Sequence, residues 1–409
     1  MTRRTLSAGL LIAVACGCSG DAAPELSVTM RAVESPAGAG SGEPFLSATD
    51  GAVHMSWLEA SPTGGHDLRF SRWDSGAWTE AGVIATSERF FVNWADFPSV
   101  TAGADGSLWA HWLERGPAGG YDYAVRVVRS ADGGRKWSEP WTLHDDSSPV
   151  EHGFVSALPL GGGMAFLWLD GRNTGSEAPV PPADRAMTLR HRFVGADGTP
   201  GPETLVDARV CDCCQTDAAL TAAGPVAVYR DRTREEIRDI YVTRLVNGAW
   251  TEGVAVHADG WEIGGCPVNG PAVAADGDDV AVAWFTAPGD VPRVKVAFSS
   301  DAGAHFGAPL EVDGGNPAGR VDVLMLGEGV ALVSWLERTG GEDAEIRLRR
   351  VDSAGGMSES VTLDASSAER ASGFPRMIRS SEGSVLMAWT DVTGDRPHVR
   401  VARLDLEGS

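Results

Sequence analysis

The chain has 409 residues and a formal net charge of −22 at pH 7. So acidic a chain lacks the broad basic face through which proteins bind nucleic acid or an anionic membrane surface, and we expect neither partner. Its 51 glycines and 14 tryptophans, with turn dipeptides throughout, are typical of short strands joined by tight turns.

The first segment, residues 1–18, has the layout of a secretory signal: two arginines, a short apolar run, then small residues and cysteine. The run is too short to span a bilayer. Cys16 and Cys18 each follow small residues, and both patterns resemble the lipobox of bacterial lipoproteins. We therefore expect lipidation of Cys16 or Cys18, with simple secretion as the alternative. The protein would then be extracytoplasmic, in the periplasm or at the cell surface, and held at the membrane by its lipid anchor only.

After a linker over residues 19–25, an aromatic residue recurs at the end of an apolar strand pattern, usually followed two positions later by a carboxylate. It occurs seven times, at intervals of 51 to 61 residues, as Trp57, Trp112, Trp168, Tyr229, Trp284, Trp335 and Trp389. Self-similarity at such a period indicates a repeat architecture. A full unit contains four short strand patterns separated by glycine-rich turns, which is typical of a propeller blade.

The two ends of the chain predict how the ring closes. The last unit, residues 374–406, contains only three strand patterns, whereas residues 26–33 read as a strand ahead of the first unit. We expect this N-terminal strand to complete the last blade, which removes two exposed edges. The sequence thus predicts an all-β, seven-bladed β-propeller as a single domain over residues 26–409.

Two turns carry a more specific pattern. Residues 130–137, Ser-Ala-Asp-Gly-Gly-Arg-Lys-Trp, and residues 300–306, Ser-Asp-Ala-Gly-Ala-His-Phe, fall between the third and fourth strands of their units. Both resemble the Asp-box, or BNR repeat, of the sialidase superfamily. In this turn the aspartate and serine side chains bond backbone amides, glycine takes the bend and the aromatic packs under the blade. The motif is structural, so it supports the fold more than an activity.

The resemblance implies a sialidase-like propeller, for which six blades are the alternative count. It also implies a carbohydrate partner and, if the protein is an enzyme, a sialidase-like glycoside hydrolase. The chain departs from the family at the site, since the first blade lacks the expected arginine and no tyrosine lies beyond Tyr241, where the family has its nucleophile. We therefore expect a non-standard or non-catalytic member of the superfamily.

In a propeller, the loops that follow the second strands and the loops that lead into the first strands open on one face. Residues 230–239 place four arginines and four acids there, in the fourth unit. Arginine forks bind carboxylate or hydroxyl groups, and paired acids exchange protons. We expect a polar ligand, a glycan, on the face of the fourth and fifth blades, although these charges could instead bond one another and fasten neighbouring blades. The acid/base candidates are Asp231, Glu235 and Asp96, and the ligand-binding candidates are Tyr229, Arg232, Arg320 and Arg376.

The remaining cysteines lie in the loops that lead into the fourth and fifth blades, which adjacent blades bring together; they are Cys211, Cys213, Cys214 and Cys266. In an oxidising compartment unpaired thiols rarely persist without a metal or redox role. Three interpretations stay open: two disulfides, a soft-metal site for copper or zinc assisted by His152 or His257, or a labile vicinal disulfide. The competing class for the whole protein, expected to be a monomer, is therefore a non-catalytic scaffold or a soft-metal-binding protein.

Overall fold

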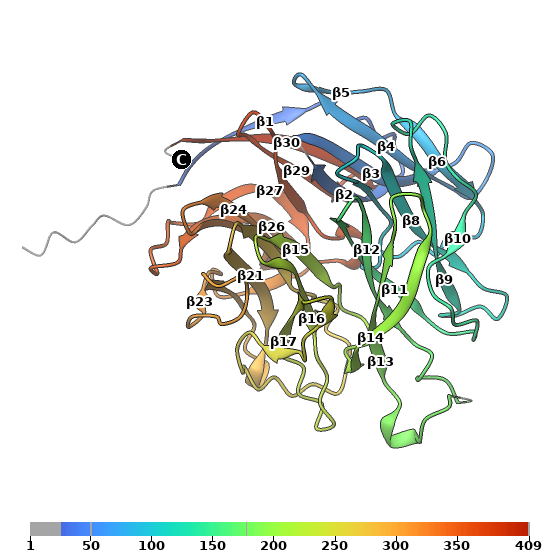
Figure 1. Ribbon diagram of the computed structural model, residues 1–409. Helices are drawn as coiled ribbons and strands as arrows, with labels where there is room; N and C mark the ends of the chain where they lie inside the picture. The colour runs from blue at the N-terminus through green and yellow to red at the C-terminus, as the bar shows by residue number, and fades with distance from the viewer. Residues whose placement is uncertain (1–25, 50, 177, 408–409) are drawn as a thin grey trace, which may run out of the picture.

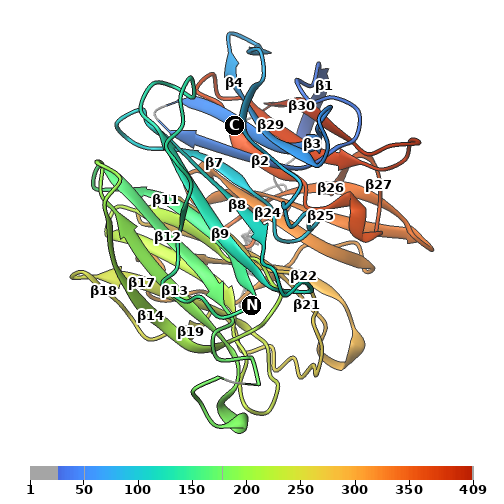
Figure 2. The ribbon, with the colours of Figure 1, turned by 90° about the vertical axis from the view of Figure 1, so that its right-hand side faces the viewer.

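The computed structural model describes residues 26–407 apart from residues 50 and 177. Within this range, seven small antiparallel sheets surround a common centre (Figure 1, Figure 2). The fold is therefore an all-β, seven-bladed β-propeller, which confirms the predicted class and decides against the six-bladed alternative. The expected signal segment, both candidate lipidation cysteines and the linker lie outside the described residues.

The first strand of each blade is the innermost one, and these strands contact one another in turn around the channel. They are β2 (Ser41–Thr49), β7 (Ser99–Ala102), β11 (His152–Leu160), β15 (Asp217–Thr221), β20 (Ala272–Asp276), β24 (Pro317–Gly327) and β28 (Arg376–Arg379). The second strands are β3 (Ala52–Ala60), β8 (Leu108–Arg115), β12 (Gly163–Asp170), β16 (Gly224–Arg230), β21 (Asp279–Thr286), β25 (Val330–Gly340) and β29 (Val385–Asp391).

The third strands follow outward in each sheet. They are β4 (His66–Asp74), β9 (Tyr123–Ser130), β13 (Met187–Val194), β17 (Ile240–Val246), β22 (Arg293–Ser299), β26 (Asp343–Asp352) and β30 (His398–Glu407). The outer edges are formed by β5 (Ala77–Trp78), β6 (Gly82–Ser87), β10 (Trp141–Thr142), β14 (Pro200–Val210), β18 (Ala249–Trp250), β19 (Val254–Ala255), β23 (Leu310–Glu311) and β27 (Val361–Ser367). Three short 3-10 helices lie in loops: η1 (Pro182–Asp184), η2 (Pro288–Asp290) and η3 (Arg370–Ser372).

The ring closes with the N-terminal strand, as the sequence predicts. β1 (Ser27–Val33) pairs antiparallel with β30 and supplies the outer strand of the last blade, with Val33 opposite Val401 (Figure 1). The last blade thus joins the two ends of the described chain. Without β1, β30 would present a row of unpaired backbone groups at the surface.

The recurring aromatic and carboxylate pattern has a local structural cause. Residues two apart in a strand point to the same side of the sheet, so an indole N–H can reach the acid that follows it, as it does at Trp57, Trp168 and Trp335. Trp168 donates from Nε1 to Asp170 at 3.0 Å, and Trp335 donates to Glu337 at 2.6 Å. Both tryptophans are fully buried, so the acid satisfies a donor that would otherwise be left without a partner.

Both predicted Asp-box turns form between the third and fourth strands. In the first, the amide of Gly134 donates to Ser130 Oγ at 2.9 Å, and the amide of Lys136 donates to Asp132 Oδ1 at 2.9 Å. Trp137 then packs edge-on against Phe70 of the preceding blade. In the second turn the bonding serine is Ser299, one residue before the expected one, because the turn begins where β22 ends.

Candidate functional site in the central channel

The inner strands enclose a cavity of about 600 Å³. Its walls are mostly apolar, and its charged side chains gather toward the starts of the inner strands; they are Asp96, Asp217, Asp322 and Arg376. At the other end, the lining residues Ala104, Gly161 and Leu220 are exposed. The cavity therefore opens at the face where the inner strands end, and its charged groups lie at its closed end.

The closed end lies on the face where the sequence places the ligand. Gln215 spans the channel there: its Nε2 donates to the carbonyl of Ala95 at 2.6 Å, and its Oε1 accepts from the amide of Gly270 at 3.0 Å. Beside it, Trp94 stacks on Phe374 with ring centroids 5.8 Å apart. The loops that lead into the inner strands thus pack across the channel, so a ligand on that face would contact loop surfaces rather than the channel interior.

Of the three arginines predicted to bind the ligand, Arg376 is the one that lines the cavity. The guanidinium carbon lies 5.0 Å from the ring centroid of Phe97 and 5.8 Å from that of Phe45, within cation–π range. Its Nη1 is 3.7 Å from Asp322 Oδ1, and burial raises the pKa of Asp322 to about 6. This is a positive group held by aromatic faces and one acid, and its Nε is buried without a hydrogen-bond partner among the described residues.

Three acids of the inner ring also fasten neighbouring blades. Asp96 accepts from the amide of Phe154 at 2.7 Å, Asp217 from that of Val273 at 2.9 Å and Asp322 from that of Met377 at 2.6 Å. In each case the acceptor and donor belong to consecutive blades. The role considered for the charges of the fourth blade, that of fastening neighbouring blades, is therefore one that these acids have.

Asp96 belongs to a buried group that the sequence reasoning missed. Tyr123 Oη lies 2.9 Å from Asp96 Oδ2 and 2.6 Å from Glu151 Oε1. Burial raises the pKa of Asp96 to about 8 and that of Glu151 to about 7. A tyrosine hydroxyl has one proton to donate, so both contacts are hydrogen bonds only when a carboxyl supplies a second proton. No local signal joins these residues, because they come from β9 and from the loops that precede β7 and β11.

The charged loop of the fourth blade is largely paired within itself. Arg232 bonds Glu236 at 2.7 Å and Asp212 at 3.0 Å, and Arg238 bonds Glu236 at 2.7 Å. Glu235 is exposed. A ligand gripped by Arg232 would have to compete with two carboxylates.

The other two candidates in this blade are buried. Tyr229 donates to Asp207 Oδ2 at 2.6 Å and packs in the core of the blade. Asp231 is 8% exposed, and burial together with Asp207 raises its pKa to about 7. Asp231 and Glu235 thus lie in the fourth blade, whereas Asp96 lies in the channel wall at the second, and the three are not brought together as one acid/base set.

Arg320 is occupied by the backbone of a neighbouring loop. Its guanidinium donates to the carbonyls of Ala368, Glu369 and Gly373 at 2.8 to 3.2 Å and to Ser372 Oγ. It also lies over the ring of Trp94 at 4.8 Å. Burial lowers its pKa to about 10. We therefore assign Arg320 to holding the loop that contains η3.

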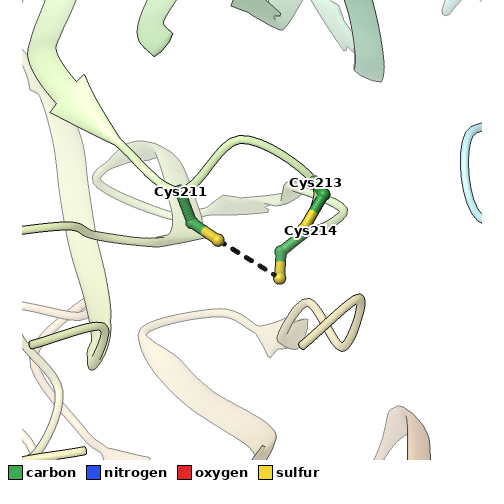
Figure 3. Close-up of side chains that lie close together, drawn as sticks. All are labelled: Cys211, Cys213 and Cys214. Carbon is green, nitrogen blue, oxygen red and sulfur yellow. Dashed lines mark hydrogen bonds between the residues drawn. The ribbon is translucent and has the colours of Figure 1, made fainter. Parts of the chain in front are cut away.

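Three cysteine sulfurs gather in the loop between β14 and β15 (Figure 3). The Sγ atoms of Cys211, Cys213 and Cys214 all lie within 4.8 Å of one another, and those of Cys211 and Cys214 are 3.7 Å apart. A disulfide needs about 2.0 Å, and all four described cysteines are free thiols, including the exposed Cys266. The group of three could hold a metal ion.

The two histidines expected to assist a metal are engaged elsewhere. His152 stacks on His144 with centroids 3.7 Å apart, and its Nε2 lies 3.1 Å from Asp146. His257 Nε2 lies 3.8 Å from Asp259. Within the described residues, the cluster of potential metal ligands consists of the three cysteines alone.

A positive environment surrounds the cluster. Arg238 Nη1 donates to Cys211 Sγ at 3.3 Å, and Arg230 is buried nearby. Hydrogen bonding with Cys213 and Cys214, assisted by the two guanidiniums, lowers the pKa of the Cys211 thiol well below its ordinary value. Burial raises the pKa of Cys214 to about 12. Of the three thiols of the cluster, Cys211 is the one whose pKa is lowered.

The fold and the channel define the class of the protein as an all-β, seven-bladed propeller with a central cavity. Within the described part of the chain, no helix has the length and apolar character needed to cross a membrane. No protein-family model matches the chain, and no curated protein matches its sequence.

Solved structures do share the fold. A protein of unknown function from Dyadobacter fermentans is 14% identical, with 94% of this chain and 99% of that chain covered and a TM-score of 0.52. The polysaccharide lyase Uly1 is 8% identical, with 88% of each chain covered and a TM-score of 0.53. Trypanosoma rangeli sialidase, in complex with 2,3-difluorosialic acid, is 14% identical, with 88% of this chain and 59% of that chain covered and a TM-score of 0.50. At these identities the likeness shows the fold alone.

Proposed function

We propose that the protein is an exported, lipid-anchored propeller that binds a carbohydrate ligand in its central channel. The observation that carries this proposal is Arg376, whose guanidinium lies against two phenylalanine rings at the polar end of the cavity. Such a guanidinium can donate hydrogen bonds to hydroxyl or carboxylate oxygens, and the carboxylate of Asp217 can accept from hydroxyls. The cavity of about 600 Å³ falls in the range typical of small-molecule sites.

The structural neighbours support this class of ligand. One is a polysaccharide lyase, and another is a sialidase with 2,3-difluorosialic acid bound. Because Arg376 shares the cavity with the acids Asp96, Asp217 and Asp322, the carbohydrate we propose is bound through its hydroxyl groups. The surface of the fourth and fifth blades remains the alternative location, with Arg232 as its contact; Tyr229, the other candidate there, is buried.

If the protein is also a glycoside hydrolase, Asp96 is the acid/base residue we propose. It lines the same cavity as Arg376 and shares a hydrogen-bonded group with Tyr123 and Glu151. A carboxyl whose pKa is raised to about 8 carries its proton at neutral pH, as a general acid requires.

Binding to an array of acidic and neutral oligosaccharides tests the proposal. Arg376→Met keeps an unbranched side chain against the rings but removes every donor, and we expect it to weaken binding by about tenfold or more. Arg379→Met is the matched control, since Arg379 is an exposed residue of the same strand. If Arg376→Met melts like the wild type and still binds the same sugars equally well, the channel proposal is wrong.

A second candidate function is binding of a soft metal ion, copper or zinc, by the cysteine cluster. The short distances between the three sulfur atoms, all within 4.8 Å of one another, favour this function. Thiolates select ions of this kind. Metal content of the purified, reduced protein after exposure to each ion tests this function, and a protein that retains neither ion would rule it out.

A further inference from the structure

We propose that Cys211, Cys213 and Cys214 form a three-coordinate site for Cu(I), and that the exposed Cys266 is the thiol through which the ion enters and leaves. This inference rests on the second candidate function, soft-metal binding, and names its ion, its ligands and its route. It assigns the four cysteines two different roles.

The spacing of the sulfurs suits a single small ion. Thiolates about 2.3 Å from an ion at the centre of a triangle lie about 4 Å from one another. The three sulfurs lie within 4.8 Å of one another, and the Cys211 and Cys214 sulfurs are already 3.7 Å apart. Small side-chain rotations would therefore complete a trigonal site, and Figure 3 shows the Cys211 and Cys214 sulfurs joined by a dashed line.

The donor set favours Cu(I) over Zn(II). Structural zinc sites are almost always tetrahedral, with four protein ligands, whereas soft thiolate ligands suit Cu(I). Cys266 is not part of the compact group, and the group contains no imidazole or carboxylate. Three sulfurs without a harder fourth donor match the softer, lower-coordinate ion.

Two guanidiniums lie beside the cluster and favour a negatively charged thiolate complex of Cu(I). Each thiol that binds releases its proton to solvent, so three thiolates around one Cu(I) carry two negative charges. Arg238 donates to Cys211, and Arg230 acts on both Cys211 and Cys214. Two carboxylates also lie near: Asp212 is paired with Arg232 at 3.0 Å, and Glu236 is shared by Arg232 and Arg238 at 2.7 Å. The guanidiniums therefore offset part of the charge of the complex in a buried site, where uncompensated charge would be costly.

Cys266 has the position of an exchange ligand. It lies in the loop that leads into β20 and is exposed, whereas Cys211 and Cys214 are buried. Its thiol interacts with that of Cys213, the half-buried member of the cluster. An incoming Cu(I) can bind Cys266 first and then pass to Cys213 by exchange of one thiolate for another, with no change in oxidation state.

Thiol protection in the full, unmutated chain tests the ligand assignment. The reduced protein is loaded anaerobically with one equivalent of Cu(I) and alkylated, and the labelled cysteines are identified by peptide mass spectrometry. We expect Cu(I) to protect Cys211, Cys213 and Cys214 and to leave Cys266 reactive. Protection of all four cysteines, or of none, would overturn the assignment.

Competition with a chromogenic Cu(I) chelator then tests the roles of single residues. We expect Cys214→Ser to weaken Cu(I) binding by about 100-fold or more. For Cys266→Ser we expect the equilibrium affinity within about threefold of wild type and the rate of copper release to the chelator slowed about tenfold. Equal losses of affinity in the two variants would mean a four-thiolate site and would contradict the exchange role.

Zinc binding separates the choice of Cu(I) as the ion from the broader proposal that the cluster binds a soft metal. If the cluster binds Zn(II) and Cu(I) fails to displace it, the choice of ion is wrong while soft-metal binding stands. If neither ion protects any cysteine in the folded protein, the second candidate function fails as well.

Discussion

Asp96 combines a structural contact with an unusual protonation state. Its carboxyl accepts the amide of Phe154 and meets the hydroxyl of Tyr123, which also contacts Glu151. Burial raises the pKa of Asp96 from 3.8 to about 8, so the folded protein holds a proton that the unfolded chain loses at lower pH. Stability from this group is fully present below the unfolded pKa of 3.8 and is lost as the pH rises toward about 8.

We therefore predict that Asp96→Asn makes the unfolding free energy less dependent on pH. The asparagine amide reproduces the protonated carboxyl, with its oxygen accepting from Phe154 and its nitrogen donating to Tyr123. One titrating proton accounts for a slope of at most about 1.4 kcal/mol per pH unit. Urea unfolding between about pH 5 and pH 8 measures this slope. A slope identical in variant and wild type would show that Asp96 does not hold the proton.

Arg320, a ligand-binding candidate from the sequence, donates to backbone carbonyls around η3. We predict that Arg320→Ala lowers the unfolding free energy by about 2 to 4 kcal/mol, because the carbonyls around η3 lose a buried charged donor. Chemical denaturation measures the loss, and Arg379→Ala is the exposed control. Equal stability of the two variants would contradict this role.

At the scale of the element, the second strands could be predicted because their side chains alternate between the two sides of the sheet, which gives the sequence a period of two residues. The indole of Trp335 and the carboxylate of Glu337 bond each other, and Glu337 also accepts from the amides of Gly314 and Asn316. That acid thus ties the second strand to the loop that leads into the first strand of the same blade. The carboxylate of the repeat motif therefore positions a loop in this blade.

We predict that Glu337→Ala destabilises the protein by about 2 to 3 kcal/mol, since three donors lose their shared acceptor. Glu342→Ala, at an exposed acid of the turn after β25, should change the stability by less than about 0.5 kcal/mol. Thermal melting of the two variants compares them. A similar effect of both substitutions would contradict the structural reading of the motif.

At the scale of the whole molecule, the repeats and the turn residues predicted the ring and its closure, because repeats and turns are patterns of residues close together in the sequence. The site was harder to predict. Asp96, Tyr123 and Glu151 meet only when blades pack, and the packing of Gln215 and Trp94 across the channel depends on loops from several blades. The spacing of the cysteines predicted their cluster, but it did not predict that His152 and His257 would lie outside the cluster.

Closure by β1 yields a further prediction for the ring. Deleting residues 27–33 removes the outer strand of the last blade and exposes β30 as an edge. We expect the variant to melt at least about 5 °C lower and to self-associate. Calorimetry and sedimentation measure both effects. A monomer with unchanged melting would show that the last blade does not need β1.

Hydrogen–deuterium exchange with and without a bound oligosaccharide most directly tests the central claim that the channel is the ligand site. We predict slower exchange in the peptides that line the cavity, around residues 154–161 and 376–378, with little change at residues 231–239. Protection confined to residues 231–239 would place the ligand on the loop surface of the fourth blade and contradict the channel site.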